Sequence, residues 1–472
     1  MRRIAALMLA PALVLGMLAV DDTRRERSAA AGRAVEAADV RTVPPDVVLI
    51  LTDDQRRDTL THMRAVREHL RDKGTRFSRT VAPTPTCCPS RASILTGLVA
   101  RHTGVYGNTP PDGGWRTFFD NGLEERTLAT ALQARGYRTG LFGKYFNGFA
   151  QNELGASAGH RPPGWNTFLT FKNRTGGYHD YTLTDGSRFG SHAEDYSTDV
   201  LGARAARFIR STAAQRPLFV MFTPFGPHKP YRPARRHLHD YADLPSYRPR
   251  SVTEDVADKP PFLSDRPRVK QATIDFVRAR QQEQLSSVDD AVAGLVRALR
   301  QTGRLHNTLL VYMSDNGLMI GDHHMIGKDL PYRFATDVPL VIRWDGRIDA
   351  GRVDRRLAAT IDVTATIAEA AGADMTTDGL SLLDEPGRSD LLLEGRKWKR
   401  LDGSVPHPAF CGLRSTRYLF VRYADGFEEL YDYRNDPYEA RNRAADPEYS
   451  SQVSAMRART MQECVPTPPG YS

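Results

Sequence analysis

The residues whose types most clearly suggest a chemical role lie in segment 86–97, which reads TCCPSRASILTG. Two thiols, a proline and an arginine stand there at the predicted start of a helix. A thiol at a helix N-terminus is expected to have a lowered pKa and to face a site for anions. The plainer alternative is a buried structural pair of cysteines near a turn. The segment therefore predicts either a reactive position beside an anion site or a structural turn.

Polar residues follow four of the predicted strands, and ligands of open α/β sheets bind beyond the carboxyl ends of strands. Each motif alone has a plain reading, because Asp-Asp often caps a helix and Asp-Asn-Gly often forms a turn. Four of them at corresponding strand ends, together with segment 86–97, favour one composite site. The motifs are Asp53-Asp54-Gln55, Gly143-Lys144-Tyr145, Pro227-His228-Lys229-Pro230 and Ser314-Asp315-Asn316-Gly317.

The acidic motifs indicate a hard metal ion. Carboxylates and an asparagine oxygen suit Ca²⁺ or Mg²⁺ and not a metal that prefers thiolates. The spacing does not fit an EF-hand loop, and the sequence contains neither Cys-x-x-Cys nor His-Glu-x-x-His. A metal site would therefore have to be assembled from distant segments of the chain.

Apolar runs and helical patterns alternate along most of the chain and predict an α/β sheet with helices on both faces. Residues 244–268, rich in Pro, Asp and Arg, are interpreted as a surface insertion. Strands are predicted at 47–52, 139–145, 218–223, 308–314 and 339–343, and helices at 127–135, 201–210, 281–303 and 358–371.

The texture of the sequence changes near residue 389. Segments 418–423 and 429–432 read as antiparallel strands joined through Ala424-Asp425-Gly426. We expect a signal peptide and spacer at 1–40, a catalytic domain at 41–388 and a smaller C-terminal subdomain at 389–472.

The N-terminus predicts export. Met1-Arg2-Arg3 precedes an apolar run from Ile4 to Val20, the pattern of a secretory signal peptide. Pro11 and Gly16 interrupt the run, which argues against a stable membrane span, although an uncleaved anchor stays open. We expect a secreted or extracytoplasmic protein. If Cys87 and Cys88 belong to the site, Cys411 and Cys464 remain, and in an exported protein their pairing would tie the tail to its subdomain.

The charge balance suits anionic partners. The 472 residues carry a formal net charge of +9, which attracts anionic substrates and would also suit nucleic acid. The arginines are spread along the chain without a long basic run or a nucleic-acid-binding module. We therefore expect no nucleic-acid partner.

These segments, in this order, resemble the type I sulfatase family across nearly the whole mature chain. Segment 86–97 resembles its Cys-x-Pro-Ser-Arg signature, and the motifs at 51–55, 142–145 and 314–317 resemble its metal and Gly-Lys segments. Later landmarks recur at 338–343, 429–432 and 435–437. The Cys-Cys-Pro form, the Lys-Tyr-x-Asn form, Asn108 and segment 287–290 look most like N-acetylglucosamine-6-sulfatases and related heparan endosulfatases.

The resemblance implies an alkaline-phosphatase-like mixed sheet flanked by helices, with a smaller C-terminal antiparallel subdomain. It implies that Cys87 is oxidised to formylglycine, whose hydrate attacks the sulfur of a sulfate ester, and that a formylglycine-generating enzyme is a maturation partner. It also implies a bound Ca²⁺, in preference to Mg²⁺. The implied metal ligands are Asp53, Asp54, Cys87, Asp315 and Asn316.

The remaining roles also follow from the resemblance. Arg91 would hold the hydrated aldehyde and nearby carboxylates, Lys144 and Lys328 would bracket the sulfate, and His228 would be the general acid for the departing sugar oxygen. Each has a plain alternative, since Lys328 could be solvated and His228 could cap a turn. His323 and His324 compete with His228 for the acid role.

The sequence departs from the common family pattern at two places. Phe146, followed by Asn147, stands where many members have a histidine, which leaves the base that activates the diol open. Arg333 follows Tyr332 where a glutamate is common, and it could reach an anionic substrate group or face solvent.

We expect a sulfuric ester hydrolase that acts on a sulfated sugar, with 6-sulfated glucosamine as the candidate substrate. The alternatives are a phosphonate or phosphate ester hydrolase of the same superfamily and a non-catalytic, exported Ca²⁺-binding protein. The sequence does not determine the natural substrate, exo or endo action, or the oligomeric state.

Overall fold

The structure is a computed structural model that describes residues 44–173, 176–383, 386–398 and 406–471. The predicted signal peptide and spacer at 1–40 lie outside the described residues. From Pro45 onward the chain forms one compact unit. The predicted boundary between residues 388 and 389 falls just before the first strand of the C-terminal sheet, and it stays a prediction.

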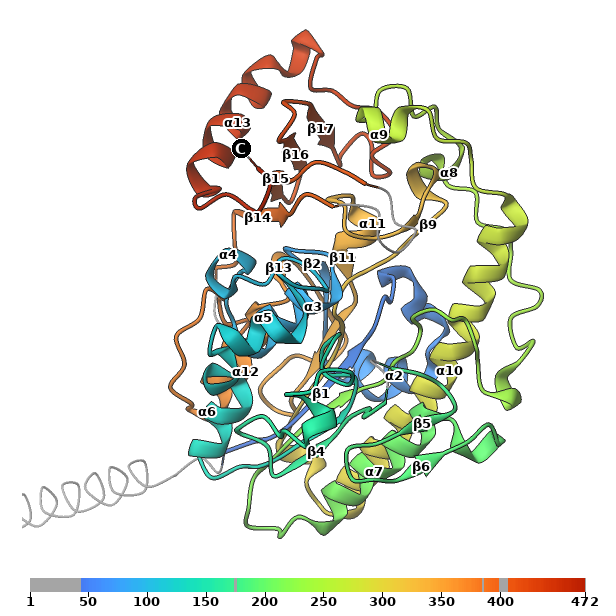
Figure 1. The fold of residues 1–472 in the computed structure, drawn as a ribbon, viewed down its shortest axis with the longest axis vertical. Helices are drawn as coiled ribbons and strands as arrows, with labels where there is room; N and C mark the ends of the chain where they lie inside the picture. The colour runs from blue at the N-terminus through green and yellow to red at the C-terminus, as the bar shows by residue number, and fades with distance from the viewer. Residues whose placement is uncertain (1–43, 174–175, 384–385, 399–405, 472) are drawn as a thin grey trace, which may run out of the picture. The chain divides into compact units, whose positions relative to one another are not determined.

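A nine-stranded mixed sheet organises this unit (Figure 1). Its order is β11-β2-β12-β8-β1-β7-β3-β4, with β13 paired to β2. The strands β8, β1, β7, β3 and β4 run parallel, whereas β12 is antiparallel to β8 and β2. The strands are β1 Asp46–Thr52, β2 Thr75–Val81, β3 Arg138–Gly143, β4 Thr167–Leu169, β7 Leu218–Thr223, β8 Thr308–Ser314, β11 Asp337–Val338, β12 Leu340–Arg343 and β13 Arg352–Ala359.

Helices cover both faces of the sheet, as expected. Val48 and Ile50 of β1 pack into one apolar cluster with α2, α7 and α10, whereas Val47, Leu49 and Leu51 pack into another with α3, α5, α6 and α12. This alternation explains why β1 is a continuous apolar run, since both its faces are buried. The helices are α2 Arg64–His69, α3 Cys87–Thr96, α5 Gly114–Asp120, α6 Leu128–Ala134, α7 Ser197–Ser211, α10 Gln271–Gln301 and α12 Asp362–Ala371.

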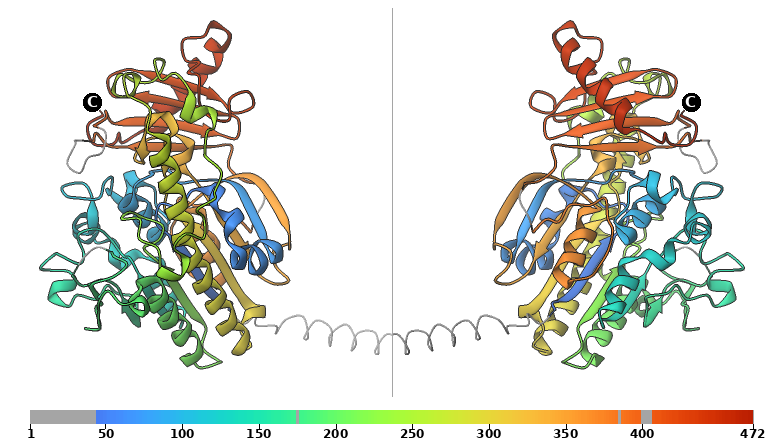
Figure 2. Two further views of the ribbon diagram at one scale, coloured as in Figure 1. Left: turned by 90° about the vertical axis from the view of Figure 1, so that its right-hand side faces the viewer. Right: turned by 90° about the vertical axis from the view of Figure 1, so that its left-hand side faces the viewer.

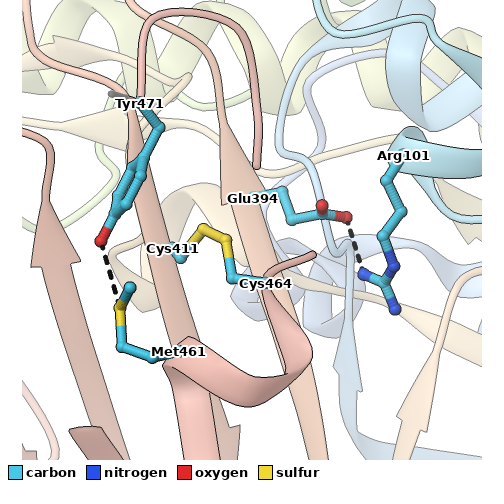
Figure 3. Close-up of a disulfide and its surroundings, with 6 residues drawn as sticks. All are labelled: Arg101, Glu394, Cys411, Met461, Cys464 and Tyr471. Carbon is cyan, nitrogen blue, oxygen red and sulfur yellow. Dashed lines mark hydrogen bonds and ion pairs between the residues drawn. A yellow bond between two sulfur atoms is a disulfide. The ribbon is translucent and has the colours of Figure 1, made fainter. Parts of the chain in front are cut away.

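A second, antiparallel sheet lies toward the C-terminus (Figure 2), with the order β14-β15-β16-β17. Its strands are β14 Asp390–Gly395, β15 Phe410–Ser415, β16 Tyr418–Tyr423 and β17 Glu428–Asp432, and α13 Ser450–Glu463 packs against it. A disulfide joins Cys411 of β15 to Cys464 after α13 (Figure 3). The expected pairing is therefore confirmed, and Cys87 and Cys88 remain free.

Short elements complete the fold, and two predictions of the sequence analysis need correction. They are α4 Ala100–Thr103, α8 Arg250–Thr253, α9 Pro261–Ser264, α11 Arg333–Thr336, β5 Tyr181–Thr182, β6 Arg188–Phe189, β9 Met319–Ile320 and β10 Ile326–Gly327. Segment 244–268 is not only a surface insertion, because it buries Glu254, Lys259 and Leu263. The predicted helix at 358–371 begins at Asp362, because residues up to Ala359 belong to β13.

The predicted α/β fold with a mixed sheet and a C-terminal antiparallel sheet is confirmed. Because β8, β1, β7 and β3 are parallel neighbours, their carboxyl ends meet at one edge of the sheet. All four motifs of the sequence analysis follow these ends. Among the residues that the structure describes, no helix has both the length and the apolar character needed to cross a membrane.

Candidate active site

Cys87 is the first residue of α3, a helix whose ten residues are all buried. Its Sγ lies 3.4 Å from Asp53 Oδ1 and 2.7 Å from Lys328 Nζ. Burial and the charge of Asp53 raise the pKa of the Cys87 thiol well above its ordinary value, although Lys144 and Lys328 oppose the shift. The lowered thiol pKa expected from the helix N-terminus is therefore wrong. Cys87 is a neutral thiol held among charges.

Two carboxylates follow β1 directly. Asp53 Oδ2 accepts a hydrogen bond from Lys144 Nζ and lies 3.5 Å from Arg91 Nη2. Burial alone would raise the pKa of Asp53, but the nearby cations, Lys144 foremost, hold it below its ordinary value. Asp54 has a φ of 66°, a left-handed conformation that aspartate tolerates better than most residues. Its Oδ1 accepts hydrogen bonds from Lys328 and, at 2.7 Å, from Asn316 Nδ2.

Asp315 and Asn316 come from the neighbouring strand end, after β8. Asp315 Oδ2 lies 2.8 Å from Arg91 Nε, and its Oδ1 accepts from the backbone nitrogen of Asp54 at 3.2 Å. Burial and the charge of Asp53 raise the pKa of Asp315 to about 6, despite the contact with Arg91. Three carboxylates are thus packed closely enough that one of them resists ionisation.

Two buried cations, Arg91 and Lys144, and the half-buried Lys328 surround these carboxylates. Arg91, on α3 one turn after Cys87, also donates from Nη1 to the carbonyl oxygen of Lys144 at 3.0 Å, so its guanidinium links α3 to three strand ends. Lys144 follows β3, and Lys328 follows β10. Burial acts to lower the pKa of both lysines, but the surrounding carboxylates raise it overall. Both lysines are therefore charged.

His228 follows β7 and faces the same cluster, its Nε2 lying 3.6 Å from Asp54 Oδ2. Its Nδ1 lies 2.5 Å from the carbonyl oxygen of Lys229. A carbonyl can only accept, so Nδ1 carries the proton in neutral His228 and Nε2 is left with its lone pair. Burial lowers the pKa of His228, against the opposing charges of Asp54 and Asp53.

The two competing histidines point elsewhere. His323 Nδ1 lies 2.6 Å from Glu254 Oε1, and His324 Nδ1 lies 2.7 Å from the carbonyl oxygen of Arg266. Neither belongs to the cluster around Asp54. The structure therefore brings together Cys87, Arg91, Lys144, His228 and Lys328 with the four oxygen-bearing residues Asp53, Asp54, Asp315 and Asn316.

The donor set fits a hard cation. Potential ligand atoms of Asp53, Asp54, Cys87 and His228 all lie within 4.8 Å of one another. The Lys328 ammonium lies among Asp54 Oδ1, Cys87 Sγ and Asn316 Oδ1, the last at 3.4 Å, and so it stands in for a cation held by three of the expected ligands. Burial and the charge of Asp53 raise the pKa of Asp315, and a divalent ion bound to these carboxylates would offset their mutual repulsion.

Several supporting residues had no signal in the sequence. The Tyr178 hydroxyl donates to the carbonyl oxygen of His228 at 2.6 Å, and Gln281 Nε2 lies 3.4 Å from the carbonyl oxygen of Asp54. Tyr178 lies in a loop and Gln281 lies inside a long helix, so no motif marks either of them. Asn108, which the resemblance did mention, accepts from the backbone nitrogen of Cys88 at 2.9 Å.

The two departures from the family pattern are structural. Phe146 is buried and stacks on Phe118, with 4.5 Å between ring centroids. Arg333 donates to the carbonyl oxygen of Pro437 and lies 3.2 Å from Asp337, so it supports the fold beside the C-terminal region.

Comparison with known families gives two matches. The sulfatase family model matches residues 45–373, and the model described as N-sulphoglucosamine sulphohydrolase, C-terminal, matches residues 321–465. The first match alone spans well over half of the chain and includes every residue of the candidate site.

Named relatives agree with these matches. The chain is 31% identical to human N-acetylglucosamine-6-sulfatase over 74% of its own length and 67% of that protein's length. It is 29% identical to the extracellular sulfatase SULF-1 homolog of Drosophila melanogaster over 72% of its own length, but this covers only 31% of that protein. The chain thus spans about two thirds of the first relative and less than a third of the second.

Solved structures share the fold. One described as a complex with its substrate D-glucosamine-2-N,6-O-disulfate superposes with a TM-score of 0.76 at 20% identity and covers 89% of this chain and 97% of that one. A phosphonate monoester hydrolase from Silicibacter pomeroyi gives 0.71 at 24% identity, covering 90% and 96%. The family models and the human relative, together with the cluster at the strand ends, place the chain in the sulfatase family.

Proposed function

We propose that this sulfatase-family hydrolase removes sulfate from a sulfated sugar, with the 6-O-sulfate of glucosamine as its substrate class. The convergence of Cys87, two lysines and a carboxylate cluster at one sheet edge is the observation that carries the proposal. Lys144 and Lys328 supply charge for a sulfate group, and Asp53 and Asp54 supply oxygens for a cation. The relatives named N-acetylglucosamine-6-sulfatase support the substrate class.

The unmodified thiol is poorly suited to attack an ester, because burial and Asp53 keep it protonated. This supports conversion of Cys87 to formylglycine by a formylglycine-generating enzyme, whose product, once hydrated, supplies a hydroxyl nucleophile at this position. Cys87 is accessible to such an enzyme only before α3 is packed, since all ten residues of the helix are buried in the folded chain. We therefore place the modification before folding is complete.

The expected metal is Ca²⁺, held by Asp53, Asp54, Asp315, Asn316 and the oxygen at position 87. A bound Ca²⁺ would act as a Lewis acid toward the sulfate oxygens. The chain's own contribution is to present these ligands on two adjacent strand ends and to fix them through Arg91, which contacts Asp315 directly. Hard oxygen ligands at this density favour Ca²⁺.

His228 is the proposed general acid. Since its Nδ1 is committed to the carbonyl oxygen of Lys229, transfer of a proton from Nε2 requires the imidazolium form. Asp54 and Asp53 favour that form, and burial disfavours it. Tyr178 fixes the backbone at His228 and thereby aims the ring into the cluster.

Peptide mass spectrometry of the purified protein tests the proposal directly, because conversion of the Cys87 thiol to an aldehyde lowers the mass of the peptide that contains it. Turnover is then compared on glucosamine-6-sulfate, nitrophenyl sulfate and nitrophenyl phenylphosphonate. We expect hydrolysis of the two sulfate esters in preference to the phosphonate. A thiol at position 87 with no sulfate release would leave the non-catalytic alternative, and preference for the phosphonate would favour the ester hydrolase alternative.

We also propose export. The disulfide between Cys411 and Cys464 is typical of oxidising compartments, and one relative is named an extracellular sulfatase.

A further inference from the structure

A groove of about 810 Å³ lies beside β4, the outermost strand of the main sheet, and shares no residue with the candidate active site. It is bounded by β3, by the edge strand β4, by α7 and by the turn between β5 and β6. Figure 1 labels β4, β5, β6 and α7 in its lower part. Its floor contains Phe142, Phe168 and Phe208, all of them buried. Its walls carry the polar side chains of Asn166 and Thr167.

The groove is strongly basic. Five cationic side chains line it, whereas Asp185 is the one carboxylate among the lining residues. The cations are Arg138, Arg161, Lys172, Arg204 and Arg207. Like charges gathered in one groove create a positive potential that attracts anions.

Two of the five cations are engaged. Arg138 donates to the hydroxyl groups of Ser211 and Thr212 at 3.0 Å, and Arg204 lies 3.6 Å from Asp185. Arg161, Lys172 and Arg207 are exposed, and none of them has an ion pair with any residue that the structure describes. These three side chains come from separate segments and are available to a ligand.

The geometry points to a sulfated polysaccharide as this ligand, and we propose the groove as a second binding site for it. Guanidinium groups bind sulfate oxygens through pairs of parallel hydrogen bonds, and the amide of Asn166 and the hydroxyl of Thr167 suit sugar hydroxyls. Single-stranded nucleic acid would need exposed rings for base stacking, whereas Phe168 is only 8% exposed and Phe142 only 1%. The choice of polymer rests on the proposed function.

The groove and the active site share one strand. β3 begins at Arg138 in the groove and leads through Phe142 to Lys144 in the cluster. A long anionic chain held in the groove would keep its sulfate esters at a high effective concentration near the active site. The site would therefore favour polymeric over monosaccharide substrates without changing the chemical step.

The test is a triple variant, Arg161→Gln with Lys172→Gln and Arg207→Gln, measured against immobilised heparin and a size-defined heparin oligosaccharide. We expect the oligosaccharide to bind about 10- to 100-fold more weakly, and the slope of log affinity against log salt to fall by about one for each cation removed. The matched control removes three exposed arginines outside the groove, through Arg135→Gln, Arg297→Gln and Arg300→Gln. Equal weakening in both variants would contradict the proposed binding role of the groove, because overall charge would then explain binding.

Catalytic activity is measured separately from heparin binding. The groove variant should turn over nitrophenyl sulfate at the parental rate and lose kcat/KM only on the polymer. Suppose that the protein has no sulfatase activity but its binding of heparin depends on the groove. This result would contradict the proposed function and would support the proposed binding site. Sulfatase activity together with unchanged heparin binding in the groove variant would contradict the proposed binding site but not the proposed function. Equal groove-dependent affinity for single-stranded DNA, desulfated heparin or anionic vesicles would overturn the assignment to sulfated polysaccharide.

Discussion

At the scale of single residues, the side chain at position 228 has the most diagnostic role. His228→Gln should lower kcat on a sugar sulfate by about 10²- to 10⁴-fold, the usual contribution of a general acid. Nitrophenolate leaves readily without protonation, so nitrophenyl sulfate should lose much less activity. Steady-state kinetics on the two substrates measure this difference.

The control is His102→Gln, because His102 is an exposed histidine whose Nδ1 lies 2.7 Å from Asp378, outside the cluster. It should retain full activity. An equal loss on both substrates in His228→Gln would show that His228 has a binding or structural role and does not protonate the leaving group.

The two adjacent cysteines should respond oppositely to substitution. Cys87→Ala should abolish turnover, because the position that supplies the nucleophile is lost. Cys88→Ser should retain activity, since Cys88 Sγ accepts a hydrogen bond from the backbone nitrogen of Asn147 at 3.3 Å, which a hydroxyl can also accept. Turnover of both variants, together with circular dichroism to establish folding, checks the prediction. Activity in Cys87→Ala would contradict the proposed nucleophile.

At the scale of elements, the disulfide joins β15 to the end of α13 across 53 residues of sequence. Closing a loop of that length stabilises the folded state by about 4 kcal/mol in the chain-entropy account. Cys411→Ser with Cys464→Ser should therefore lower the melting temperature while leaving the active-site cluster intact. Calorimetry with and without reductant measures the effect, and an unchanged melting temperature in the variant would contradict it.

The buried pair of His323 and Glu254 connects the segment after β9 to segment 244–268, and Glu439 lies 3.6 Å from the other ring nitrogen. Burial acts to lower the pKa of His323, but the hydrogen bond to Glu254 and the carboxylate of Glu439 raise it to about 9, with Lys259 opposing. Because the folded pKa is raised, the stabilisation is complete below the unfolded pKa of about 6.5 and is lost as pH rises through about 9.

His323→Gln should therefore unfold more easily than the parent at pH 6, by about 3 kcal/mol, and the difference should shrink toward pH 10. Melting temperatures of both proteins across this range measure it. The ring centroids of His323 and Tyr332 are 4.2 Å apart. A difference that stays constant with pH would show that this packing, and not protonation of His323, accounts for the effect.

The elements also show what the sequence could predict. β7 and β8 match their predicted bounds, because strands buried on both faces are continuous apolar runs. β2 and β13 were missed, since TRFSRTV and RVDRRLAA carry half-buried and exposed arginines and so are not continuous apolar runs. The motifs after the strands were found because each carries its chemistry locally. Tyr178 and Gln281 were not, since their roles depend on three-dimensional contacts alone.

For the whole molecule, the candidate site is the point where distant parts of the chain are held together. Asp54 and Asp315 are 261 residues apart in sequence, yet the backbone nitrogen of Asp54 donates a hydrogen bond to the carboxylate of Asp315. The repulsion between the buried carboxylates opposes folding, and a divalent cation bound to them would offset it. Metal binding should therefore be measurable in the stability of the entire unit.

Removal of Ca²⁺ by a chelator should lower the melting temperature of the parent protein, and Ca²⁺ should restore it. A ligand that binds only the folded state stabilises it by about 2.7 kcal/mol at a hundred times its dissociation constant. Asp315→Ala should abolish this response together with activity, whereas Asp72→Ala, which changes an exposed carboxylate beside Arg71, should keep it. Differential scanning calorimetry with Ca²⁺ and with Mg²⁺ compares the two ions. An unchanged melting temperature and full activity in metal-free buffer would contradict the assigned ligands, because a cation that holds two strand ends and the start of α3 together cannot leave without a cost in stability.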